Sequence, residues 1–269
     1  MNALQKSLYH LDGAYYLSSK AKEDNNMPMA LNYQFSIFGN YSIVPTPEIV
    51  TQLMARINAS TGEAFLPNII NAQQIEVSSN QIKSISNLGF ITQNHKYSIS
   101  LLNNRIDINY NKNNDEAAPE IDEFFYLATK GLNEIINYFN LSSYRLAANF
   151  QLVFELPNFE RLQILGNKVI TTASYYDGKT FCEWSNRVNS QAEINILGAT
   201  EGINVITDIS SATSVQGEPA ILYHIDINTL PQNQRMRFSS PAIEAFSEAV
   251  IPTAKEIIAD VERLIGNEQ

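Results

Sequence analysis

The chain has 269 residues, a mass of 30.2 kDa and a formal net charge of −10, from 18 basic and 28 acidic side chains. A surface that follows phosphate groups needs clustered Lys and Arg, and here the basic residues are scattered, so we expect no nucleic-acid partner. The single cysteine, Cys182, excludes an internal disulfide framework, and no apolar run reaches the roughly 20 residues that a membrane span needs.

The beginning of the chain has neither the charged segment nor the apolar segment of a secretory signal. We therefore expect a cytoplasmic protein without membrane contacts. Residues 1–30 are polar and weakly periodic. They are expected to form an N-terminal arm that docks on the body or on a second subunit, or else a partly ordered terminus.

The first predicted elements are a strand and a short helix. Leu31–Phe38 alternates apolar and polar residues, which is typical of a half-buried strand. Thr46 then offers a capping hydroxyl, and Pro47 suits the first helical position. An apolar stripe from Val50 to Ile57 completes the prediction of a helix.

Three short strands are predicted next, as a meander over Leu88–Thr92, Tyr97–Leu102 and Arg105–Tyr110. Asn103-Asn104 predicts a tight hairpin between the last two, because Asn tolerates the positive φ of such turns.

A strong helix and a long strand follow a polar loop. Residues 119–139 carry an apolar stripe with a period close to 3.6, including Phe124, Phe125 and Ile135. Arg145–Glu155 then alternates as a strand, and the break after it at Leu156-Pro157-Asn158 is the predicted midpoint of the chain.

The second half is predicted to be rich in strands. Asp177-Gly178 is a strong hairpin signal between two of them. The predicted strands are Lys168–Tyr176, Lys179–Val188, Glu193–Leu197, Gly202–Ile209 and Ala220–Asn228. A helix over 240–265 follows, capped by Ser240, and Pro252 is expected to kink it.

These elements predict an α+β fold with antiparallel sheets and helices packed on one face. The physical reason is that both long helices have one wide apolar stripe while most strands alternate, so each sheet has one apolar face for a helix to cover. The pattern of strands followed by one long amphipathic helix occurs twice. We therefore expect two similar halves, 31–156 and 157–269, after the arm.

Catalytic signatures are not found in the sequence. The three histidines are dispersed, and no HxxxH, CxxC or HExxH spacing exists, so no metal site, cofactor or catalytic residue is predicted. Glycine motifs for dinucleotides, P-loops and hydrolase elbows are also absent. Cys182 is expected to be a structural thiol.

A few polar residues on strand faces are candidates for ligand binding. His224 and Asp226 share one strand face, and Asp107 lies on a similar face of another strand, although nothing in the sequence makes those strands neighbours. Solvated sheet faces are the favoured explanation of these residues. An anionic ligand would need a basic pocket. The candidate binding residues are Arg105, Asp107, Arg145, Arg187, His224 and Asp226.

Two stretches carry a resemblance to a known family: Ile121–Glu155 and Ile221–Ile257, the latter including Tyr223–Ile227 and the segment Phe-Ser-Ser-Pro-Ala-Ile-Glu-Ala-Phe. In hydrophobic pattern the chain resembles a sporadically distributed, functionally uncharacterised bacterial family of similar length. The resemblance covers about half of the chain and implies no catalytic residues. The patchy distribution of that family implies mobile genes, including antiphage defence and toxin–antitoxin systems.

The leading functional hypothesis is a non-enzymatic, protein-binding component of a bacterial or phage conflict system, with a partner encoded by a neighbouring gene. The tyrosine pairs Tyr15-Tyr16 and Tyr175-Tyr176 suit an interface, so a homo-oligomer is a further hypothesis. One alternative is a sensor of small molecules or nucleotides with its pocket between the halves. Another is a hydrolase or nuclease that uses Asp107, His224 and Asp226.

Overall fold

The computed structural model describes residues 29–76, 81–112, 117–170, 178–181, 183–214 and 217–266, except the side chains of 71–76 and 81–86. Residues 1–28, Tyr175-Tyr176 and Cys182 lie outside this part of the chain, so the predictions for the arm, the tyrosine pairs and the thiol stay predictions. The described helices include none that is long and apolar enough to cross a membrane.

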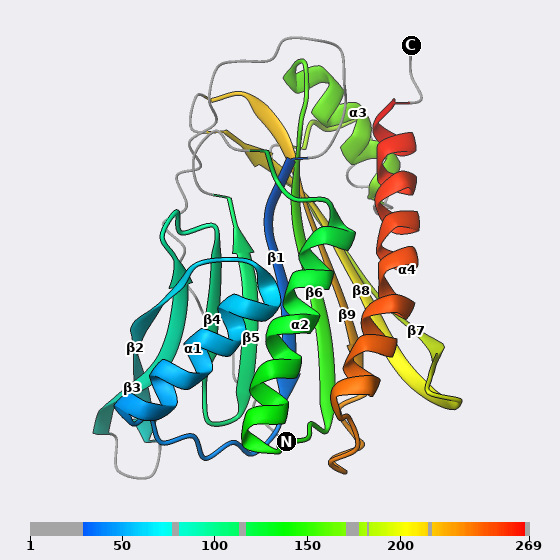
Figure 1. Ribbon diagram of the computed structural model, residues 1–269. Helices are drawn as coiled ribbons and strands as arrows, with labels where there is room; N and C mark the ends of the chain where they lie inside the picture. The colour runs from blue at the N-terminus through cyan, green and yellow to red at the C-terminus, as the bar shows by residue number, and fades with distance from the viewer. Residues whose placement is uncertain are drawn as a thin grey trace.

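The described strands form one antiparallel sheet of nine strands in the order β2-β3-β4-β5-β1-β6-β9-β8-β7 (Figure 1). In chain order they are β1 Met29–Phe38, β2 Phe65–Glu76, β3 Gln81–Thr92, β4 Tyr97–Leu101, β5 Arg105–Asn111, β6 Arg145–Glu155, β7 Ser185–Ile196, β8 Ala199–Thr213 and β9 Pro219–Thr229. The predicted α+β class is confirmed. The strands of both predicted halves join in a single sheet, because β6 pairs with β1 on one side and with β9 on the other.

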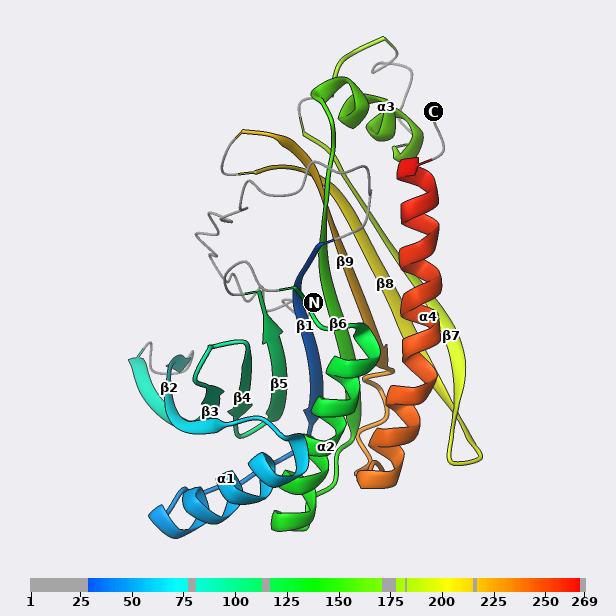
Figure 2. The same ribbon diagram turned by 45° about the horizontal axis from the view of Figure 1, so that its top comes forward.

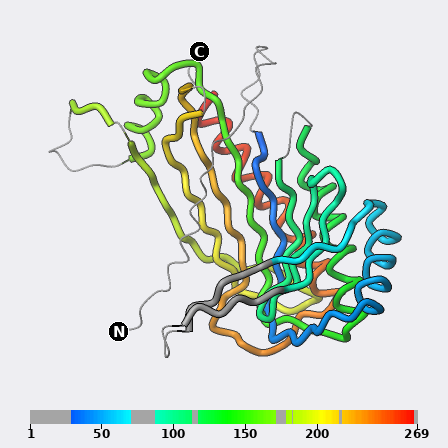
Figure 3. The backbone as a smooth tube through the Cα atoms, turned by 90° about the vertical axis from the view of Figure 1, so that its left-hand side faces the viewer, coloured from blue at the N-terminus to red at the C-terminus, as the bar shows by residue number. Residues whose placement is uncertain are grey.

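Three long helices cover one face of this sheet: α1 Pro47–Thr61, α2 Ile121–Phe139 and α4 Ser240–Gly266 (Figures 2 and 3). The shorter α3, Phe159–Val169, lies beside the C-terminal end of α4. Helices α1 and α4 begin where the sequence predicts, and α2 begins at Ile121, two residues after its predicted start. Thr46 caps α1 by accepting from the Ile49 amide, and Glu120 and Glu123 form a capping box at α2.

Aromatic rings fill the space between the sheet and the helices. Phe35 of β1 lies 5.2 Å from Phe125 of α2 and 5.9 Å from Phe246 of α4, measured between ring centroids. Phe150 of β6 stacks on Phe125 at 5.4 Å. All four rings are fully buried, and burying each side chain stabilises the fold by about 2 kcal/mol. The core therefore runs without a break across the centre of the sheet.

Several predicted elements need correction. The chain after Pro157 forms α3, where the sequence predicted a break and then a strand from Lys168. The predicted hairpin at Asp177-Gly178 lies partly outside the described residues, and its described part, residues 178–181, is not a strand. The later strands are longer than predicted, since β7 and β8 form one hairpin that turns at Leu197 and Gly198. Strand β2 was not predicted.

Candidate functional site

The sheet face opposite α1, α2 and α4, here called the open face, is polar along its central strands. Alternate residues of each strand point to it, because successive side chains in a strand leave opposite faces. Cross-strand register therefore arranges them in rows. One row runs Asn109, Gln34, Asn149, Asp226 from β5 to β9, and the next runs Asn111, Asn32, Gln151, His224, Asp208, Arg187 from β5 to β7.

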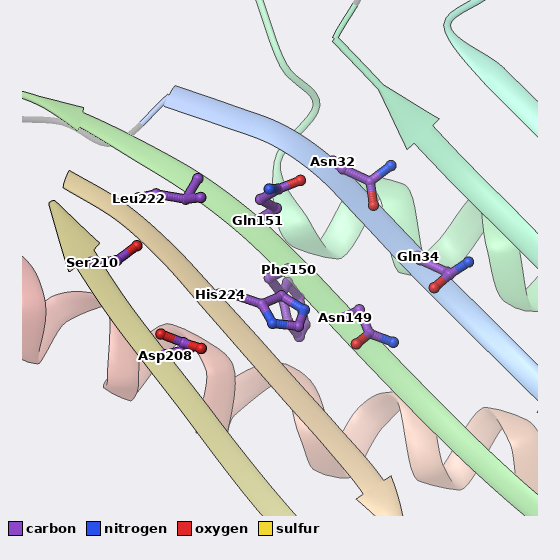
Figure 4. Close-up of a pocket in the computed structure, with 9 residues that line it drawn as sticks. All are labelled: Asn32, Gln34, Asn149, Phe150, Gln151, Asp208, Ser210, Leu222 and His224. Carbon is purple, nitrogen blue, oxygen red and sulfur yellow. The ribbon is translucent and has the colours of Figure 1, made fainter. Parts of the chain in front are cut away.

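A depression of about 340 Å³ lies on this face over β1, β6, β9 and β8 (Figure 4). We call it the central depression. Four amide side chains line it on the side of β1 and β6, the amide quartet of Asn32 and Gln34 on β1 and Asn149 and Gln151 on β6. The remaining lining residues are Phe150, Asp208, Ser210, Leu222 and His224.

His224 lines the central depression directly across from Gln151 of the amide quartet. Figure 4 shows its imidazole reaching from β9 toward β6, beside Asn149, with Asp208 on the other side. Partial burial lowers the pKa of His224 below its ordinary value, and Arg187 acts in the same direction. The carboxylates of Asp226 and Asp208 oppose that shift in pKa. The neutral imidazole, with one donor and one acceptor, is therefore the favoured form here.

The polar groups around the depression hold one another in place. Asn228 donates to the Asp226 carboxylate at 2.9 Å and accepts from Asn204 at 3.3 Å. Arg187 makes an ion pair with Asp208 at 3.5 Å. Asn32 donates to the Tyr110 carbonyl at 2.9 Å.

A second polar cluster lies on the open face at the other end of β1. The buried carboxylate of Asp107 accepts from the Ser36 hydroxyl at 2.6 Å and pairs with Arg105 at 2.8 Å. Burial raises the pKa of Asp107, although Arg105 and Ser36 act against that rise. The Phe38 ring lies between two guanidinium groups, with Arg105 at 5.9 Å and Arg145 at 5.0 Å from its centroid. Its partners give this cluster a packed, structural character.

All six candidate residues from the sequence thus lie on the open face, in two groups. His224, Asp226 and Arg187 lie at or beside the central depression, whereas Arg105, Asp107 and Arg145 lie in the cluster around Phe38. The structure does not bring Asp107 together with Asp226, since β1 and β6 separate their strands. Three strand spacings put the two carboxylates about 14 Å apart or more.

Sequence reasoning missed the amide quartet. A signal was present, because Asn and Gln occur at i and i+2 on the polar face of both predicted strands, as Asn32 and Gln34 and as Asn149 and Gln151. The described residues contain no group of three or more His, Cys, Asp or Glu that converges as metal ligands do. Apart from Asp208, the polar side chains that line the central depression are neutral hydrogen-bond donors and acceptors.

Comparison with known proteins gives no match to a family model, to a curated protein or to a solved structure.

Proposed function

We propose that this protein is a non-enzymatic binding component and that a protein partner docks on the open face, centred on the central depression. The observation that carries the proposal is the amide quartet at the middle of that face. Each side-chain amide offers both a donor and an acceptor, which is the pattern that a peptide group presents in return. Extended polypeptide is thus the chemistry that this array complements best.

The charges around the depression also favour a protein partner over a nucleotide. Asp208 and Asp226 lie at or near the depression, and Arg187 beside it is paired with Asp208. The two guanidinium groups that were candidates for an anion, Arg105 and Arg145, lie instead on either side of Phe38. A phosphate at the amide quartet would therefore meet carboxylates and not a cluster of cations.

The proposal includes the two similar halves, and repeated sequences support them. Arg-Ile-Asp-Ile-Asn at 105–109 of β5 recurs as His-Ile-Asp-Ile-Asn at 224–228 of β9. Pro-x-Ile-x-x-Phe begins at Pro119 before α2 and at Pro241 in α4. The order strand, helix, antiparallel meander, helix also occurs twice, from β1 to α2 and from β6 to α4. In this division β6 belongs to the second half, whereas the predicted boundary after residue 156 placed it in the first half.

The repeat gives a physical reason for the position of the depression. Arg105 on β5 faces Phe38 on β1, and its counterpart His224 on β9 faces Gln151 on β6. In the first half a phenyl ring and a guanidinium fill the place. In the second half a shorter amide and an imidazole leave it open. We infer that the second half keeps the binding function at a position that the first half uses for packing.

The test introduces the packed residue pair of the first half at the equivalent position of the second half. Gln151→Phe with His224→Arg recreates the pair of Phe38 and Arg105 at the equivalent place, so the sheet is expected to accept it. Capture of partners from the native host by the tagged full chain should recover a stoichiometric protein with the parent. We expect the double variant to bind that protein about tenfold or more weakly, the loss that follows removal of a central contact worth about 1.4 kcal/mol.

Gln93→Phe, in the exposed turn after β3, is the matched control, since it adds a phenyl group far from the depression. Equal capture of the same partner by the parent and by a folded double variant would contradict the proposed site.

A second candidate, a sensor of a small polar molecule, is favoured by the size of the depression. Its volume lies within the range of about 300–1,000 Å³ found for small-molecule sites, and it spans β1 and β6, where the halves meet. A thermal-shift screen of uncharged polar metabolites tests this candidate, because a true ligand raises the melting temperature by mass action. Gln151→Phe is expected to abolish any rise in melting temperature that comes from a ligand at this site.

The biological setting proposed for the protein is a bacterial or phage conflict system in the cytoplasm, and it rests on the family resemblance of the sequence alone. The gene next to this one is then the first candidate for the partner. Co-expression of the two proteins and co-purification through a tag on one of them tests that pairing directly.

A further inference from the structure

The two edges of the sheet differ in how they are protected. Strand β2 forms one edge and contains Pro67, which has no amide proton to offer to another strand. Strand β7 forms the other edge over 12 residues and contains neither Pro nor Lys. Its register with β8 is continuous from Ser185 to Ile196, so no bulge interrupts it. Strand β7 therefore presents a long, regular ladder of outward-facing backbone groups.

The surroundings leave this edge accessible. All residues from Arg187 to Glu193 are exposed, and Val188 has an exposed fraction of 52%. Figure 1 shows β7 at the outer margin of the sheet, and α4 packs against β7 from the helix-covered face. Among the described residues, no strand supplies partners to the backbone groups on the free side of β7.

A comparison of the strand order on the two sides of the sheet also indicates that β7 is an open edge. Counting outward from the central strands, β1 is followed by β5, β4, β3 and β2, whereas β6 is followed by β9, β8 and β7. Strand β7 therefore takes the place that β3 takes on the other side. Strand β2 pairs along the outer side of β3 over its whole length, but β7 has no such strand among the described residues.

We propose that β7 pairs with β7 of a second copy of this chain, in antiparallel register about a two-fold axis at Ser190. This inference goes beyond the proposed function and does not depend on it. In this register Ser190 lies opposite Ser190 of the second copy, and a residue before Ser190 lies opposite the residue equally far after Ser190 in the second copy. Arg187 meets Glu193 of the second copy, and this contact occurs twice because of the symmetry. On the other face of the sheet, Val188 meets Ala192 of the second copy.

The charges on β7 favour a second copy of the chain as the partner, and they favour this register. Arg187 and Glu193 carry the only formal charges of β7, and both point to the open face. In the paired state each Arg187 would lie between its own Asp208 and Glu193 of the second copy, in one row across three strands. Opposite charges directly across an antiparallel pair stabilise it, and like charges destabilise it. The dimer would have one continuous sheet and two central depressions on the same face.

The first test measures mass by sedimentation equilibrium on the full chain. The parent should show twice the 30.2 kDa of one chain. Arg187→Glu places two acidic side chains opposite each other at both contacts and should raise the dissociation constant of the dimer by about tenfold or more. Adding Glu193→Arg to that variant restores opposite charges and should restore the dimer.

The control is Arg56→Glu on α1, which also reverses the charge of an arginine that is paired with a carboxylate, here Glu134 of α2. It should dimerise as the parent does. A parent that stays monomeric at every concentration overturns the proposal, and so does a dimer that Arg187→Glu leaves as stable as the parent's.

The second test fixes the register by crosslinking in a Cys182→Ser background. Ser190→Cys places two thiols opposite each other at the axis, within reach of a disulfide under mild oxidation. Ala192→Cys is the matched control, because its two copies would lie about 13 Å apart along the strands and could not be bridged. A covalent dimer from Ser190→Cys alone is expected. A dimer of the parent combined with no crosslink from Ser190→Cys overturns this pairing.

Discussion

At the scale of single residues, the repeated motif Ile-Asp-Ile-Asn places its aspartate in two different environments. Asp107 follows Arg105 by two residues and pairs with it, and its carboxylate is buried. Asp226 follows His224 by the same spacing, accepts from Asn228 and is only partly buried. The difference comes from the neighbouring strand, since β1 offers Ser36 and Phe38 whereas β6 offers Asn149 and Gln151.

The first prediction concerns His224 and pH. Burial lowers its pKa in the folded protein below the ordinary value of about 6.5 that the unfolded chain retains. As the pH falls below 6.5, roughly, the unfolded chain takes up a proton before the folded one does, so the free energy of unfolding decreases. We expect His224→Gln, which keeps a neutral polar side chain, to lack this component of the decrease.

The measurement is urea denaturation of both proteins at pH 7.5 and pH 5.0. All other titrating groups are shared, so the difference between the two proteins isolates the imidazole. If both lose the same free energy of unfolding on acidification, His224 is not held in its neutral form.

At the scale of elements, α4 continues through Pro252 as one helix from Ser240 to Gly266. Proline costs about 3 kcal/mol inside a helix because it removes an amide donor and crowds the carbonyl four residues earlier. Pro252 is exposed, so Pro252→Ala would restore the donor to the Glu248 carbonyl without loss of packing.

We expect Pro252→Ala to raise the free energy of unfolding by about 1 to 2 kcal/mol, since part of the gain is offset by the greater freedom of the unfolded chain. Thermal and urea denaturation measure this change. Glu256→Ala, also exposed and one turn later, is the control for helix propensity and should change stability by less than about 0.5 kcal/mol. A Pro252→Ala variant no more stable than the parent would mean that α4 needs the proline where it is.

At the scale of the whole molecule, the continuous core predicts one cooperative unfolding transition. Phe35 of β1 contacts Phe246 of α4, Phe125 of α2 contacts Phe150 of β6, and β6 pairs with strands on both sides. The single tryptophan, Trp184, is buried in the second half, so its fluorescence reports on that half alone. Far-UV circular dichroism reports on both halves.

We expect the urea transitions followed by Trp184 fluorescence and by circular dichroism to coincide, as two-state behaviour requires. Limited proteolysis should correspondingly leave one protected core, without a stable cut near Pro157. A fluorescence transition displaced from the dichroism transition would instead show that the halves unfold independently.

Much of the fold could be predicted from local pattern, and the errors have identifiable causes. The helix 119–139 and the strand Arg145–Glu155 agree with α2 and β6, because long, strongly periodic segments have few alternatives. Helix α3 was missed because Pro157 was interpreted as a break. The same segment also begins a helix, since Asn158 accepts from the Arg161 amide. Strand β2 was missed because it contains Pro67 and its apolar and polar residues do not alternate regularly.

The sequence by itself determined which face of each strand is polar, and therefore which residues were candidates for binding. Alternation along a strand is a local property, because successive side chains leave opposite faces whatever the strand pairs with. The tertiary structure alone decided which candidates meet. The contact of Ser36 with Asp107 joins residues 71 positions apart, and the pairing of Gln151 with His224 depends on β6 lying beside β9. Strand order is set by how the whole core packs, and that information is spread over the entire chain.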